Sequence, residues 1–234
     1  AVFDQAKRAY QYVLDLGQDK PNFYEAQLSL LNARFQQITQ FRTFTSEEIT
    51  QSILDFEAAL QRLGKGKVSF QLSLQLAEIR AFYAAQSKQA IEELLLLSKL
   101  PGLTDMQRAQ AKMLLADIYV LDGDIWEASL LYMQVDNDFK FETIGSEAKF
   151  KNAKIFYYDG EFEFAQAQLN VLKESTSKLI SNDAIQLAVF ITDNYGLDSN
   201  YQVMLWFATA DRMIAQHHYD SAFVLFDSIQ TQFP

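Results

Sequence analysis

The feature that most restricts the folds open to this chain is a pair of short amphipathic helical patterns within Leu115–Val135. Apolar residues recur at helical spacing around Ala116, stop at an Asp-Gly-Asp sequence centred on Gly123, and resume at the same spacing around Ala128. These patterns predict two helices joined by a tight turn. An alanine on each helix lets the two backbones approach closely, while larger side chains fill the space beside them.

The order of small and aromatic residues in this hairpin resembles the tetratricopeptide repeat, a helix–turn–helix unit of 34 residues. That repeat has a small residue at position 8, an aromatic residue at 11, glycine near 15, alanine at 20 and an aromatic residue at 24. The corresponding residues here are Ala116, Tyr119, Gly123, Ala128 and Tyr132, and Lys140 stands where the family often has proline. The resemblance implies an all-α right-handed superhelix, or α-solenoid, that binds other proteins.

The composition favours an all-α fold. Of the 234 residues, 49% are hydrophobic, which is enough to bury a sizeable core. Eight glycines and three prolines are too few for the closely spaced turns of a β-sandwich or barrel. The chain has no cysteine, which excludes disulfides, thiolate nucleophiles and cysteine-ligated zinc. The apolar run Ile91–Leu97 contains two glutamates and is far shorter than the roughly 20 residues of a membrane-spanning helix.

We expect about twelve helices in one repeat solenoid over residues 1–234. Ala1–Leu16 has the spacing of a second helix whose first helix is missing, so the chain is expected to be a fragment of a longer protein. The interval between the last two repeats has room for one inserted helix, capped by Asn182-Asp183 and ended by Asn194-Tyr195-Gly196. The expected segments are degenerate repeats at 22–64 and 68–101, better repeats at about 109–142, 146–179 and 203–234, and the inserted helix at about 180–195.

Two local signals precede the better repeats. Thr45 and Glu48 have the spacing of a capping box, in which the side chain of each residue satisfies a backbone amide of the other. They predict a helix that begins there and extends to about Leu63. The Gly-Lys-Gly-Lys sequence at 64–67 lacks the spacing of a phosphate-binding loop, because Val68 stands where that loop needs serine or threonine. We therefore expect a flexible turn at 64–67.

The net charge of −10 bears on the class of partner. A chain with this charge repels nucleic acid phosphates and anionic lipid headgroups, and its 20 basic residues are scattered along the sequence. Gly160–Leu197 is similar to the corresponding part of a group of large exported bacterial tetratricopeptide proteins. That resemblance favours a periplasmic or envelope-associated location, and a cytoplasmic location stays open.

Sequence patterns for catalysis or metal binding are weak. The only histidines, His217 and His218, are adjacent, so that their imidazoles diverge, whereas metal-binding pairs on a helix stand three or four residues apart. A calcium loop starting at Asp136 fails because Lys140 occupies a ligand position and Phe141 stands where the loop needs glycine. Paired carboxylates such as Glu47 and Glu48 lie in first helical turns or beside turn glycines. We expect no catalytic residue, cofactor or metal.

The resemblance also implies a binding groove. In the family, positions 2, 5, 9, 12 and 13 of each first helix face a concave groove that binds peptides. The candidate groove residues are Met113, Asp117, Val120, Phe150, Lys154, Tyr157, Tyr158, Phe207, Asp211 and Ile214, and Gln110 and Glu147 occupy two further groove positions. This groove is mainly apolar and aromatic, and it lacks the Lys/Asn/Arg set with which some members clamp a terminal carboxylate. Either it binds an apolar peptide or helix, or another part of the chain, such as the inserted helix, fills it.

We therefore expect a non-catalytic scaffold or adaptor that binds a peptide or protein through its superhelical surface. The alternative is an all-α enzyme with a pocket in the superhelix interior, for which Asp117, Lys154 and Asp211 are the candidates for converging ionisable groups. A third possibility is self-association, because the ends of a truncated solenoid are apolar and can stack on copies of themselves.

Overall fold

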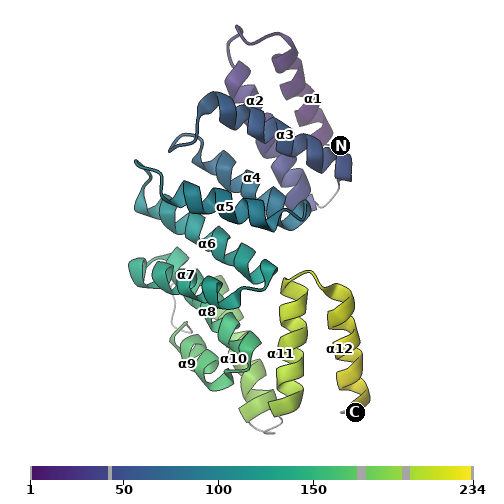
Figure 1. Ribbon diagram of the computed structural model, residues 1–234, viewed down its shortest axis with the longest axis vertical. Coiled ribbons are helices and arrows are strands. Elements are labelled where there is room, and N and C mark those ends of the chain that lie inside the picture. The colour runs from purple at the N-terminus through teal and green to yellow at the C-terminus, as the bar shows by residue number, and fades with distance from the viewer. Residues whose placement is uncertain (1, 42–43, 173–177, 197–200, 233–234) are drawn as a thin grey trace. The chain divides into compact units, whose positions relative to one another are not determined.

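The computed structural model describes residues 2–41, 44–172, 178–196 and 201–232, and these residues form twelve α-helices (Figure 1). Within each of two units, most helices that follow one another in sequence pack side by side as antiparallel pairs. The predicted all-α class and the number of helices are therefore confirmed. The helices divide into two compact units, unit 1 over Ala1–Thr104 and unit 2 over Asp105–Pro234.

Unit 1 contains five α-helices and a short π-helical extension of the second. The capping box at Thr45 is confirmed, because its hydroxyl accepts a hydrogen bond from the Glu48 amide at 3.2 Å and the Glu48 carboxylate accepts one from the Thr45 amide at 2.9 Å. The helix that it opens extends to Leu63, as predicted. The elements are α1 (Val2–Asp15), α2 (Phe23–Gln36), η1 (Gln37–Phe41), α3 (Ser46–Leu63), α4 (Phe70–Tyr83) and α5 (Ser87–Ser98).

A charged side chain lies in the middle of unit 1. Arg80 on α4 is only 2% exposed, and its guanidinium contacts the carboxylates of Glu57 on α3 and Glu93 on α5. Apolar side chains of α3 and α4, such as Phe56 and Ile79, form the core of this unit. The arginine therefore joins three successive helices from inside their interface.

Unit 2 contains the remaining seven α-helices. The small residues that predict close helix approach are buried, including Ala116, Ala128, Ala153 and Ala165. Gly123 and Gly160 take the positive φ angles that the tight turns require. The elements are α6 (Asp105–Asp122), α7 (Ile125–Asp138), α8 (Thr143–Asp159), α9 (Phe162–Leu172), α10 (Lys178–Ile191), η2 (Thr192–Gly196), α11 (Tyr201–Ala215) and α12 (Tyr219–Gln232).

Helix α10 lies where the inserted helix is predicted, at about 180–195, but the predicted cap is wrong. Asn182 and Asp183 lie inside α10 rather than capping it. The reason is that Ile180 is buried two residues earlier and extends the apolar stripe that continues through Ala184 and Ala188. At the other end, α10 is followed directly by η2, which contains the predicted stop residues Asn194, Tyr195 and Gly196, and residues 197–200 after them lie outside the described ranges. α10 packs against α9 and α8.

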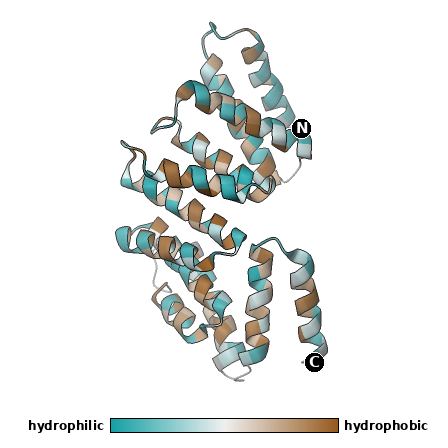
Figure 2. Cartoon of the chain, in the orientation of Figure 1, coloured by the Kyte–Doolittle hydropathy of each residue, from teal (hydrophilic) through white to brown (hydrophobic). Residues whose placement is uncertain are grey.

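Apolar and polar residues are mixed along the helices (Figure 2). Within the described ranges, no helix combines the length and the apolar character needed to cross a membrane.

Candidate functional site

A hollow of about 710 Å³ opens in unit 2 between α6, α8 and the turn that precedes α8. We call it the α6–α8 hollow. Three of its residues, Gln110, Met113 and Asp117, recur every three or four positions on one face of α6. Its lining consists of Met106, Gln110, Met113, Leu114, Asp117, Phe141, Glu142, Thr143, Ile144, Glu147 and Lys151.

The floor of the hollow contains a polar network. The Asp117 carboxylate accepts a hydrogen bond from the Tyr132 hydroxyl at 2.5 Å and two from the Lys151 ammonium, each at 2.8 Å. The Lys151 ammonium also lies 3.3 Å from the Glu147 carboxylate. Burial alone would lower the pKa of Lys151, but the charges and hydrogen bonds of Asp117 and Glu147 together outweigh this effect, so its pKa is raised and the ammonium stays charged.

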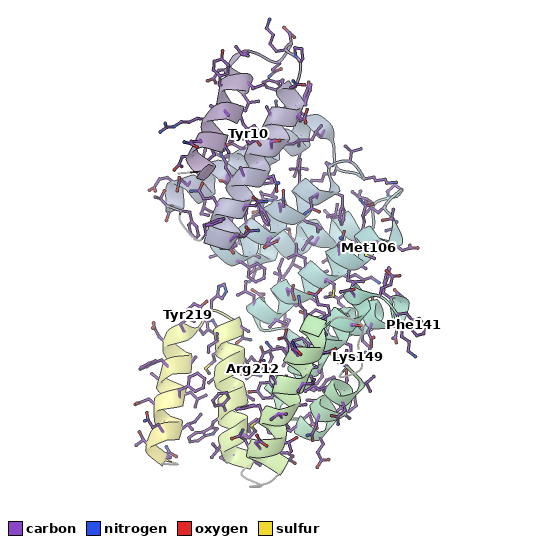
Figure 3. The ribbon with its side chains drawn as sticks, turned by 180° about the vertical axis from the view of Figure 1, so that it is seen from behind. Tyr10, Met106, Phe141, Lys149, Arg212 and Tyr219 are labelled. Atoms are coloured by element: carbon purple, nitrogen blue, oxygen red, sulfur yellow. The ribbon has the colours of Figure 1, made fainter. Side chains whose placement is uncertain are left out.

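Apolar side chains surround this polar floor. Met113 is buried, Leu114 and Ile144 are half-buried, and Phe141 is 90% exposed. Met106 at the start of α6 and Phe141 in the turn before α8 lie on the same edge of unit 2 (Figure 3). The hollow thus combines a charged base with an apolar, solvent-facing rim.

Gly145 fixes the turn that carries part of this rim. It lies in the first turn of α8, and a Cβ atom there would be 2.0 Å from the backbone oxygen of Phe139. Only glycine therefore permits the observed approach of α8 to the end of α7. Phe141 and Glu142 lie in the short turn between these two contacting residues.

Two of the ten predicted groove residues, Met113 and Asp117, line the hollow. Phe150, Lys154, Phe207 and Asp211 are half-buried elsewhere, and Ile214 is exposed on α11. Val120, Tyr157 and Tyr158 are buried in the core of unit 2. In this arrangement those three residues offer little surface to a peptide.

Helices α10 and α11 cover the part of α8 that carries Tyr157. The Tyr157 hydroxyl donates a hydrogen bond to Asp211 on α11 at 3.0 Å, and its ring centroid lies 6.5 Å from that of Phe190 on α10. Phe190 in turn packs against Phe207 on α11, with ring centroids 4.9 Å apart. Side chains of α10 and α11 therefore occupy the surface next to Tyr157, whereas the α6–α8 hollow is open.

Asp117, Lys154 and Asp211 do not form one cluster. Asp117 belongs to the network with Lys151, whereas Asp211 bonds to Tyr157. Lys154 lies over the Tyr158 ring, 5.4 Å from its centroid, and its charge acts on Asp211. The geometry separates the predicted ionisable groups into two structural networks.

The Asp211 network predicts a pH dependence of stability. Burial raises the pKa of Asp211, although the hydrogen bond from Tyr157 and the charge of Lys154 oppose the rise. A carboxyl group with a raised pKa in the folded state stabilises the fold at low pH and loses that contribution as the pH rises through the folded-state pKa. We therefore expect Asp211→Asn, whose amide oxygen can still accept the Tyr157 bond, to gain stability relative to the parent as the pH rises above about 4.

Urea unfolding of both proteins between pH 4 and pH 7 measures this difference. If the parent instead gained stability relative to Asp211→Asn over this range, Tyr157 and Lys154 would be stabilising a carboxylate, and burial would not dominate at Asp211.

Sequence reasoning missed Lys151, Tyr132 and Glu142. A usable signal exists for Lys151, because it follows Asp117 by 34 residues and carries the opposite charge. Helices α6 and α8 contact each other, so opposite charges on these two helices are candidates for pairing. No comparable pattern marks Glu142, whose place depends on the close contact at Gly145.

Residues of the two weak metal-binding patterns contact other side chains in the structure. Asp136 lies 3.2 Å from the Lys149 ammonium, and the His217 ring stacks on Tyr219 with centroids 5.6 Å apart. In the part of the chain that is described, no group of three or more histidines and carboxylates is arranged to hold a metal ion. No protein-family model and no curated protein sequence matches this chain.

Proposed function

We propose that this protein is a non-catalytic scaffold of the tetratricopeptide type, whose helical pairs form a right-handed solenoid and bind a peptide or protein segment in the α6–α8 hollow. The proposal rests on which residues line the hollow. Gln110, Met113 and Asp117 from α6 and Glu147 from α8 hold groove positions of two successive first helices, and all four line the hollow. A concave site between such helices is where the family binds peptides.

The polar network of the floor supports a binding role rather than a catalytic one. Asp117 and Lys151 neutralise each other, and Tyr132 holds Asp117 in place. The pKa of Tyr132 is raised well above its ordinary value, by burial first and then by Asp117, so its hydroxyl stays protonated and continues to donate. The network keeps α6, α7 and α8 in register while the apolar rim stays open to a ligand.

Site-specific photo-crosslinking tests this proposal. A benzoylphenylalanine at Gln110, which is exposed in the hollow, is expected to crosslink a specific partner in lysate and envelope fractions of the source cell. The same group at Gln186, an exposed glutamine on α10 outside the hollow, is the matched control. Crosslinking at Gln186 with none at Gln110 would place recognition elsewhere and reject the proposed site.

A further inference from the structure

The charges that line the α6–α8 hollow are unbalanced. Asp117, Glu142 and Glu147 contribute three carboxylates and Lys151 one ammonium, so that the lining carries a net charge of −2 (−3 + 1). Glu142 lies in the turn before α8, and its side chain does not cap that helix. On the other side of Glu142, a neighbouring hollow holds Arg108 and Lys112 together with Asp105 and Asp138, whose charges offset one another.

The single cation of the hollow is already engaged. Both oxygens of Asp117 lie 2.8 Å from the Lys151 ammonium, and Glu147 lies at 3.3 Å. An incoming carboxylate would have to displace these partners and would also meet the charge of Glu142. The hollow is therefore unsuited to an acidic segment or a terminal carboxylate.

The apolar part of the lining determines which side chains a ligand needs besides its charge. Met113, Leu114 and Ile144 form a wall beside the carboxylates, and the nearly fully exposed ring of Phe141 stands at the mouth. A ligand side chain that covers these groups gains the free energy of apolar burial. The volume of about 710 Å³ lies in the range of sites that enclose a few side chains.

We propose that the hollow binds a basic, apolar segment of a partner protein, in which leucine-like side chains alternate with lysine or arginine. This inference rests on the proposed function and names the chemistry of its ligand. The apolar side chains pack on Leu114, Phe141 and Ile144, and the cations pair with Glu142 and Glu147. The net charge of −10 on the whole chain attracts such a segment over a longer range.

Isothermal titration calorimetry with three acetylated and amidated twelve-residue peptides tests the proposal. The first alternates leucine with lysine, the second leucine with glutamate, and the third serine with lysine. The leucine–lysine peptide is expected to bind, and the other two are expected to bind at least tenfold more weakly, because one lacks the cations and the other lacks the apolar groups.

A charge-matched pair of variants separates local recognition from the long-range field. Glu142→Gln/Glu147→Gln is expected to weaken binding of the leucine–lysine peptide roughly three- to tenfold, the effect of two partly solvated charge contacts. Glu161→Gln/Glu163→Gln changes the net charge equally at two exposed positions at the start of α9 and is expected to leave the affinity unchanged.

Three outcomes would overturn the inference. They are equal or tighter binding of the leucine–glutamate peptide, an equal loss of affinity in both double variants, or no binding of any peptide. In each case crosslinking at Gln110 decides whether the proposed function also fails. A partner captured there leaves the hollow as a binding site for a ligand of different chemistry, whereas no capture and no peptide binding reject both proposals.

Discussion

Arg80→Ala is expected to lower the free energy of unfolding by about 3 kcal/mol, the low end of the cost of removing one partner from a buried ion pair. Arg80 is 2% exposed, and its guanidinium lies between Glu57 and Glu93. Truncation leaves two carboxylates without their shared cation and opens a cavity between three helices. The side chains of the two glutamates are 39% and 24% exposed, so water partly solvates them and the loss stays near the lower limit.

Urea unfolding followed by far-UV circular dichroism measures this loss, because that signal reports all the helices. Arg62→Ala is the control, since Arg62 is an exposed arginine on α3 whose Nε donates a hydrogen bond to the Ala58 carbonyl in the preceding helical turn. Arg80→Met separates the two causes, because it fills most of the volume without the charge, and we expect it to lose less stability than Arg80→Ala. Equal unfolding midpoints for Arg80→Ala and Arg62→Ala would show that the buried triad contributes nothing to stability.

Local sequence signals were enough to locate the helices. The capping box at Thr45 lies where its local chemistry predicts, because a cap depends on residues that are close in sequence. The alanines at 116 and 128 are buried for a similar reason, since a small residue at helical spacing marks the face that another helix approaches. The cap at Asn182-Asp183 is the exception, because Ile180 is already buried on the helix before it.

The site was less predictable because periodicity identifies an apolar face but not the element that covers it. Tyr157 on α8 and Met113 on α6 are both predicted groove residues. Helices α10 and α11 pack beside Tyr157, whereas Met113 lines an open hollow. The burial of Arg80 in unit 1 could not be predicted from periodicity either. Its place in the core follows from Glu57 and Glu93 on neighbouring helices, whose approach depends on tertiary packing.

Gly145→Ala is expected to destabilise unit 2 by about 3 kcal/mol, the upper part of the usual range for overpacking. A Cβ atom at this position would lie 2.0 Å from the oxygen and 2.6 Å from the carbon of the Phe139 carbonyl. Both are backbone atoms, so no side-chain rotation can relieve the clash. Either α8 moves away from the end of α7 or the turn between them changes conformation.

Tryptophan fluorescence during urea unfolding measures this effect, because the only two tryptophans, Trp126 and Trp206, lie in unit 2. Gly66→Ala is the control, since a Cβ at Gly66 meets no atom within 4 Å. Gly66 lies in unit 1, so its unfolding is followed by far-UV circular dichroism, and its stability is expected to stay within about 0.5 kcal/mol of the parent. An unchanged fluorescence midpoint for Gly145→Ala would show that the turn relaxes at little cost. In that case Phe141 and Glu142 would not be held rigidly at the hollow, and a ligand would have to order them on binding.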